Sequence, residues 1–305
     1  MCHRIASINL FTLCLFGAFA LTAQTPATSC KSTVTGTVGV VPLQSKVYGD
    51  TRTLRVWLPT DYSASANSAK RYPVLYIFDG QDLFDRCSTR PGQDEWHVDE
   101  TLTDLIAKRA VQPLIVVGID NADPGRREDE YSGYGAMVDA PQKLSAFMTR
   151  EVLPLIDGRY RTIANRTHRG VGGASLGAIA ALSLLLDQPD TFGLALLEST
   201  SLQVGNGRVL QDTSTMVQGP ARISIGVGTT EVPPSDAAAH GFPDFDAAFV
   251  SMNRTLADNM KKSLMNHPEV KLTVEPGGQH QDTYWGERFG AAVTFLFPPE
   301  PLKEN

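Results

Sequence analysis

Cysteines are few in this sequence, basic residues are not in excess, and the motifs of several large protein classes are missing. There are four cysteines, and 27 lysines and arginines stand against 33 acidic residues, for a formal net charge of −6. Nucleic acids and anionic membrane surfaces attract basic patches, so this balance argues against both as partners. The sequence has no Cys/His cluster at metal-ligand spacing, no phosphate-binding P-loop and no dinucleotide fingerprint. We therefore expect no metal, no cofactor and no nucleic-acid partner.

The one long apolar run lies at the N-terminus. Basic His3 and Arg4 precede an almost wholly apolar stretch that ends at Leu21, and Ala23 offers a small residue for cleavage. The core of this stretch is short for a membrane-spanning helix and lacks a charged stop. The pattern predicts a signal peptide over residues 1–23 and a secreted or periplasmic protein without stable membrane insertion, an uncleaved anchor being the alternative. In such an oxidising compartment Cys30 and Cys87 either form a disulfide or stay as two thiols.

Apolar strands alternate with helical stretches along the rest of the chain. Residues 24–37 are rich in Thr, Ser, Ala and Pro and predict a flexible lead-in, and two alternating runs around Val40 and Leu54 predict an antiparallel hairpin. The alternation predicts one α/β domain over residues 38–300, with a mostly parallel central sheet and helices on both faces. Expected strands cover 72–78, 114–119, 168–172, 192–197, 223–227 and 270–274, and expected helices cover 98–110, 140–156, 176–186, 246–264 and 284–297.

A glycine-flanked serine lies between one of these strands and the next helix. Gly173-Ala174-Ser175-Leu176-Gly177 matches G-x-S-x-G, the nucleophile elbow in which serine occupies a sharp, strained turn. Glycines are needed there because side chains at the flanking positions would collide across the turn. The pattern alone is weak in a glycine-rich chain, so its meaning depends on whether catalytic partners exist elsewhere.

Free serine is a poor nucleophile and needs a base, which in turn needs an orienting carboxylate. In α/β-hydrolases the three occur in the order serine, acid, histidine. His280 is the one histidine that follows the last predicted strand, and Glu231 follows the strand before it. We expect an oxyanion hole from the backbone N–H of Leu176 and a second N–H at Gln81 or Asp82. Other candidates for the acid stay open: Asp236, Asp244 and Asp246.

Several segments together resemble a known family. They are Tyr76-Ile-Phe-Asp-Gly-Gln-Asp-Leu-Phe-Asp85, Val117-Gly-Ile-Asp-Asn121, Arg127-Glu-Asp-Glu-Tyr131, Pro154-Leu-Ile-Asp-Gly-Arg-Tyr160, the elbow, Gly228-Thr-Thr-Glu231 and Gly277-Gly-Gln-His-Gln-Asp-Thr-Tyr-Trp285. From Val38 to Phe297 they are similar, in matching order, to the esterase D group. That group includes enterochelin esterases, feruloyl and acetyl-xylan carbohydrate esterases, S-formylglutathione hydrolases and mycolyltransferases. The resemblance implies an α/β-hydrolase fold with Ser175 as nucleophile, His280 as base and Glu231 as acid.

The expected activity is that of a secreted serine ester hydrolase acting through an acyl-enzyme on a carbohydrate, phenolic or siderophore ester. Two alternatives stay open: an acyltransferase of the mycolyltransferase type, and a non-catalytic binding module on the same fold. We expect polar loops at 122–135, 198–220 and 232–245 to line the pocket. Arg126, Arg127 or Arg208 could there meet an anionic group of the substrate.

Overall fold

The computed structural model describes residues 30–90, 92–122, 124–133, 139–232, 244–263 and 265–299. Its contacts divide the chain into two units, Met1–Lys31 and Ser32–Asn305. The predicted signal peptide and residues 24–29 of the predicted lead-in lie outside the described residues. Among the described residues, none of the helices is both long enough and apolar enough to span a membrane.

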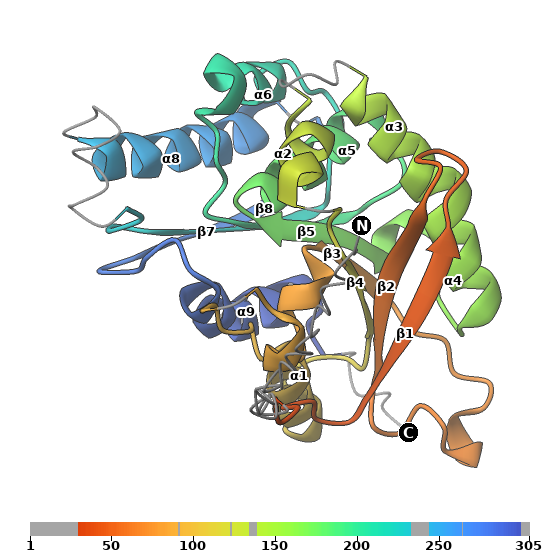
Figure 1. The fold of residues 1–305 in the computed structure, drawn as a ribbon. Helices are drawn as coiled ribbons and strands as arrows, with labels where there is room; N and C mark the ends of the chain where they lie inside the picture. The colour runs from red at the N-terminus through yellow and green to blue at the C-terminus, as the bar shows by residue number, and fades with distance from the viewer. Residues whose placement is uncertain are drawn as a thin grey trace, which may run out of the picture. The chain divides into compact units, whose positions relative to one another are not determined.

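The Ser32–Asn305 unit is built on an eight-stranded sheet (Figure 1). Its order is β1-β2-β4-β3-β5-β6-β7-β8. The hairpin of β1 and β2 is antiparallel, β2 also pairs antiparallel with β4, and all further pairings are parallel. This arrangement confirms the predicted sheet and hairpin. The strands are β1 (Thr37–Gln44), β2 (Thr51–Leu58), β3 (Val74–Phe78), β4 (Ile115–Ile119), β5 (Arg169–Ala174), β6 (Leu194–Glu198), β7 (Arg222–Gly228) and β8 (Glu269–Glu275).

Helices cover both faces of the sheet (Figure 1). Helices α1 (Val98–Ala107) and α9 (Asp282–Leu296) pack against each other on one face. The other face carries α2 (Pro124–Ser132), α3 (Ala140–Phe147), α4 (Leu153–Arg159), α5 (Leu176–Asp187), α6 (Arg208–Thr213) and α8 (Phe245–Ser263).

The central strands are apolar along their whole length because both of their faces are covered. In β3, Tyr76 and Phe78 join the core beneath α5, whereas Leu75 and Ile77 join the core beneath α1 and α9. Successive side chains of a strand point to opposite faces, so one continuous apolar run supplies two separate cores. The sheet therefore holds its carboxyl edge rigidly, and the loops at that edge start from fixed positions.

Two helices lie where loops were expected, and one helix is interrupted. The polar segment 122–135 contains α2. Its Glu130 is buried and accepts two hydrogen bonds from Arg52 of β2, at 2.7 and 2.8 Å. The segment 198–220 contains α6. The sequence pattern did not predict α2, because the partners of its charged side chains come from distant segments. The expected helix over 140–156 is divided by a π-helical turn at Met148–Val152, where Pro154 supplies no N–H to the helix.

Candidate active site

Ser175 occupies a strained turn between β5 and α5. Its backbone angles are φ 57° and ψ −122°, a conformation that L-residues rarely adopt. A Cβ on Gly173 would lie 2.7 Å from the carbonyl carbon of Gly177, and one on Gly177 would lie 2.9 Å from Asp79 Oδ2. Gly173 is therefore required by close backbone approach, and Gly177 by the Asp79 side chain packed against it. The turn lifts the Ser175 side chain from the carboxyl edge of the sheet.

Glu231 and His280 form a hydrogen-bonded pair beside this turn. His280 Nδ1 lies 2.8 Å from Glu231 Oε2, and the His280 N–H donates to the Glu231 carbonyl at 3.2 Å. The other carboxylate oxygen, Oε1, accepts from the Ser199 hydroxyl at 2.8 Å and from the Gly228 N–H at 2.5 Å. Glu231 is 1% exposed. A buried carboxylate with this many donors is held as an acceptor, and it orients the imidazole.

Aromatic rings hold the His280 imidazole from two sides. Phe249 and Trp285 meet it edge-on, with ring centroids 5.8 and 5.1 Å away and interplanar angles of 86°. Trp285 Nε1 donates to the Ser199 hydroxyl at 2.8 Å, and that hydroxyl in turn donates to Glu231. Trp285, which packs against His280, is thus linked through Ser199 to Glu231, the carboxylate that contacts His280.

Ser175 and His280 line one cavity of about 500 Å³. The Ser175 hydroxyl lies 3.1 Å from the hydroxyl of Ser201, which follows β6. The structure thus brings Ser175, Glu231 and His280 to one edge of the sheet, as the sequence predicted, with Ser201 as an unpredicted neighbour of the serine.

Carboxylates and tryptophans form much of the remaining cavity wall. Asp82 and Asp282 are 1% and 5% exposed, and the indole of Trp96 donates to Asp282 at 3.0 Å. Burial, together with the nearby charges of Asp282 and Asp79, raises the pKa of Asp82 to about 7, and burial raises the pKa of Asp282 to about 6. Within the described residues, Asp82 Oδ1 has no hydrogen-bond partner.

A largely buried ion pair forms part of the cavity wall next to the Ser175 turn. Asp79 adopts a left-handed conformation (φ 61°) at the end of β3 and accepts from Arg127 of α2 at 2.6 and 2.7 Å. The Asn121 side chain donates to the same carboxylate at 2.6 Å. Because Asp79 packs against Gly177, this pair ties α2 to the elbow. Sequence reasoning passed over Asp79 and treated Arg127 as an exposed arginine, since nothing local marks the two as partners.

Several other predicted residues have different surroundings from those expected. Asp246 accepts from the Val232 N–H at 3.0 Å, Asp244 is exposed, and Asp236 lies outside the described residues. Leu176 lines a smaller neighbouring cavity of about 160 Å³. The Gln81 side chain bonds to Asp82 and to the Asn121 N–H. Two of the arginines considered for substrate are paired on the protein itself, Arg126 with Asp50 and Glu130 and Arg208 with Asp212.

The cavity wall differs from the three predicted loops. Segment 122–135 contributes Arg127, and segment 198–220 contributes Ser201 at the serine, whereas most of 232–245 lies outside the described residues. Much of the wall comes from two segments that the sequence did not single out for this role, one between residues 90 and 96 and the other between 281 and 285. Their side chains face the cavity because tertiary contacts fold both segments over the carboxyl edge.

The sheet order and the serine turn define an α/β-hydrolase. The chain matches the model of a family described as "Putative esterase" over residues 45–296. That match covers most of the chain, so the protein belongs to this esterase family and is a carboxylic ester hydrolase.

The chain is also similar to individual proteins in sequence and to solved structures in fold. The chain is 28% identical over 251 residues to the uncharacterized protein YjcH of Bacillus subtilis, a match that covers 82% of this chain and 93% of YjcH. Its fold is similar to an IroE-like serine hydrolase from Shewanella oneidensis, with a TM-score of 0.66, 20% identity, and coverage of 86% of this chain and 80% of that one. It is also similar to a ferulic acid esterase, with a TM-score of 0.65, 21% identity, and coverage of 87% and 99%.

Proposed function

We propose that the protein is a secreted serine carboxylic-ester hydrolase that works through an acyl-enzyme, with Ser175 as nucleophile, His280 as base and Glu231 as acid. One observation carries the proposal. The 2.8 Å contact between His280 Nδ1 and Glu231 lies on the cavity that Ser175 also lines. With Nδ1 donating to the carboxylate, Nε2 is left as the atom that accepts a proton.

The reaction follows from these positions. The Ser175 hydroxyl turns from Ser201 toward His280 and attacks the ester carbonyl while Nε2 takes its proton. The backbone N–H groups of Leu176 and Gln81 stabilise the oxyanion. His280 then gives the proton to the leaving alcohol, which leaves an acyl-enzyme, and a water activated by His280 releases the acid by the same steps. Glu231 stabilises the imidazolium that forms in each half-reaction.

The cavity wall favours a substrate that carries hydroxyl groups, as carbohydrate, phenolic and siderophore esters do. The free Oδ1 of Asp82 accepts a hydroxyl, and the indoles of Trp96 and Trp285 offer apolar surface to a ring. The Asp282 carboxylate repels an anionic group at neutral pH, and Arg127 on the same cavity is already paired with Asp79. Hydrolysis rates for feruloyl, acetyl-xylan, siderophore and simple aryl esters test this choice. A preference for esters that bear a carboxylate beside the bond would contradict it.

Export agrees with the cysteine chemistry. Cys30 and Cys87 are both disulfide-bonded, and disulfides persist in oxidising compartments outside the cytosol. Cell fractionation followed by N-terminal sequencing checks this part of the proposal. The expected mature chain begins at Gln24, and recovery of the full-length protein from the cytosol would contradict export.

The nucleophile is tested with short-chain p-nitrophenyl esters and a serine-directed fluorophosphonate. We expect Ser175→Ala to lose at least about 10⁴-fold in kcat and to show no mass increase with the fluorophosphonate, whereas Ser201→Ala is still labelled. Equal rates for Ser175→Ala and the unaltered protein would show that Ser175 is not the nucleophile. Product analysis with a sugar acceptor present distinguishes hydrolysis from acyl transfer to an alcohol.

A further inference from the structure

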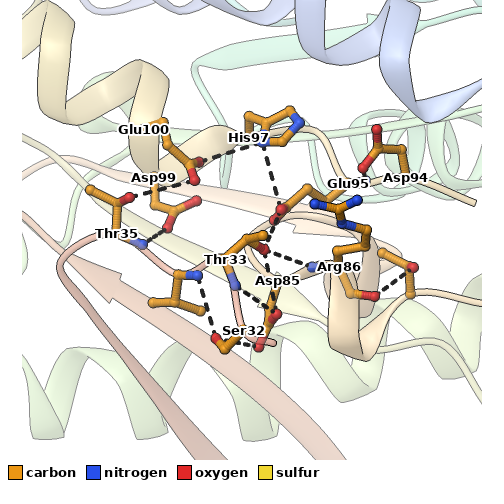
Figure 2. A network of polar contacts seen from close by, with 12 residues as sticks. Ser32, Thr33, Thr35, Asp85, Arg86, Asp94, Glu95, His97, Asp99 and Glu100 are labelled. Carbon is orange, nitrogen blue, oxygen red and sulfur yellow. Dashed lines mark hydrogen bonds and ion pairs between the residues drawn. The ribbon is translucent and has the colours of Figure 1, made fainter. Parts of the chain in front are cut away.

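Three potential metal ligands meet where the chain enters α1 (Figure 2). His97 Nδ1 lies 3.6 Å from Glu95 Oε1 and 3.8 Å from Glu100 Oε2. Two ligands of a tetrahedral zinc ion lie about 3.3–3.5 Å apart, given Zn–N and Zn–O distances of about 2.0–2.1 Å. The observed spacing therefore suits a cation bound among these atoms after small adjustments of the side chains.

Two carboxylates here, those of Glu95 and Asp99, are buried, and several carboxylate oxygens have no hydrogen-bond partner among the described residues. Glu95 and Asp99 are both 0% exposed. In the part of the chain that the structure describes, the buried atoms Glu95 Oε2, Asp99 Oδ1 and Glu100 Oε2 have no hydrogen-bond partner. Figure 2 shows the Asp99 and Glu100 carboxylates side by side. Burying such groups unpaired is costly, and a bound cation would remove that cost.

The hydrogen bonds that do reach the cluster leave its charge uncompensated. Thr33 Oγ1 donates to Glu95 Oε1, the Thr35 N–H donates to Asp99 Oδ2 at 2.5 Å, and Thr35 Oγ1 donates to Glu100 Oε1 at 3.5 Å. These are neutral donors from the segment before β1. Within the described part of the chain, His97 is the only basic side chain in ion-pair distance of Glu95 or Glu100. Three carboxylates thus share at most one positive charge.

We propose that Glu95, His97 and Glu100 bind a divalent transition-metal ion, with Zn²⁺ as the ion that best suits the site. An imidazole nitrogen among carboxylate oxygens favours Zn²⁺ over Ca²⁺ or Mg²⁺, which prefer oxygen ligands alone. The His97 side chain is 48% exposed, so the ion has a route from solvent and room for a bound water. The site is independent of the proposed catalytic triad and stands whether or not Ser175 is the nucleophile.

The ion would fix one wall of the catalytic cavity. Glu95 and His97 alternate with Asp94 and Trp96, which line that cavity. Trp96 lies between the ligands Glu95 and His97 in the chain, so an ion bound by both would restrain the backbone on either side of this wall residue. The Trp96 N–H donates to the Asp82 carbonyl at 2.9 Å, which joins this segment to the turn after β3. The inferred role is therefore structural support of the wall.

Metal uptake by the full-length purified protein tests the site. Protein is stripped with EDTA, dialysed and titrated with Zn²⁺ or Ca²⁺ by calorimetry, with bound metal counted by mass spectrometry. We expect one Zn²⁺ per chain, and a loss of affinity of at least about 100-fold in His97→Gln and in Glu100→Gln, the upper end of what loss of an outer-shell partner costs. Asp104→Asn on α1 and His168→Gln remove exposed groups of the same kinds and should bind zinc as the unaltered protein does.

Three results would overturn the proposal. Absence of zinc uptake would mean that protons neutralise the carboxylates. Equal affinity in the His97→Gln and Glu100→Gln variants would place the ion elsewhere, and tighter binding of Ca²⁺ than Zn²⁺ would refute the class of ion. Both substituted side chains are partly exposed, and circular dichroism confirms that the variants fold. Hydrogen exchange tests the structural role: amides of residues 93–98 should exchange more slowly with zinc bound, and unchanged exchange would contradict it.

Discussion

At the scale of single residues, hydrogen-bond partners distinguish Glu231, the proposed acid, from the neighbouring carboxylates. Glu231 has a donor for each oxygen, and one of these donors is His280. Asp246, close by in sequence, accepts from the Val232 N–H instead. A carboxylate acts on the imidazole only if it touches it, so the structure favours Glu231 as the acid.

This choice predicts different outcomes for two matched substitutions. Glu231→Gln keeps the shape but offers an amide to His280, so the imidazole loses its orienting charge, and we expect kcat to fall about 10³- to 10⁴-fold with little change in KM. Asp246→Asn keeps an oxygen for the Val232 N–H and should stay within a few fold of the unaltered protein. Steady-state kinetics with a p-nitrophenyl ester measures both. Similar losses in the two variants would argue against Glu231 as the acid.

At the scale of elements, α2 is anchored to the elbow by charge. Its sequence is almost entirely polar, yet Arg127 pairs with Asp79 and Glu130 with Arg52. These partners come from β2 and from the end of β3, more than 40 residues earlier in the chain. The helix therefore forms where distant partners compensate its charged side chains. Its polar sequence, taken alone, predicts a loop.

Removing the α2 anchor should destabilise the protein more than removing an exposed ion pair. Arg127→Leu leaves the Asp79 carboxylate buried without its cation, and we expect the free energy of unfolding to fall by about 3 kcal/mol. Arg208→Leu breaks an exposed pair with Asp212 and should cost less than about 0.5 kcal/mol. Urea unfolding at neutral pH compares the two. A cost for Arg127→Leu as small as that for Arg208→Leu would show that solvent already screens Asp79.

At the scale of the whole molecule, buried acids make stability depend on pH. Burial raises the pKa of Asp82 and of Glu198 to about 7, even though Arg288 opposes the shift at Glu198. Below about pH 4 such a carboxyl group is neutral in both the folded and the unfolded state, so it does not lower the free energy of unfolding. Between pH 4 and 7 the unfolded chain loses a proton that the folded chain keeps, so the free energy of unfolding falls as pH rises, and above pH 7 it levels off.

Asp82→Asn should flatten this dependence. The amide keeps an acceptor for Gln81 but cannot ionise. The free energy of unfolding of the variant should therefore exceed that of the unaltered protein by an amount that grows from pH 4 to 8. The largest expected difference is about 4 kcal/mol, from a pKa change of 3.8 to about 7. Urea unfolding across this range measures it, with the exposed Asp104→Asn as control. Parallel curves for Asp82→Asn and the unaltered protein would contradict the raised pKa.

Local pattern was enough to predict the layered fold and the candidate residues Ser175 and His280. Alternating apolar residues, helical periodicity and turn glycines act within a few residues, and they determine strands and helices wherever their apolar faces are buried. Gly173 and Gly177 belong to this class, because the turn they permit is local. The place of His280 after the last strand follows in turn from the order of those elements.

Tertiary structure decided what each polar group touches. It paired Glu231 with His280, placed Ser201 beside Ser175, and turned Asp82 and Trp96 toward the cavity. It also buried Glu95 beneath Thr33, where a search for Cys/His spacing finds nothing. The physical reason is that a polar side chain is compensated by whichever donor, acceptor or charge the fold brings to it, and those partners come from segments far away in sequence.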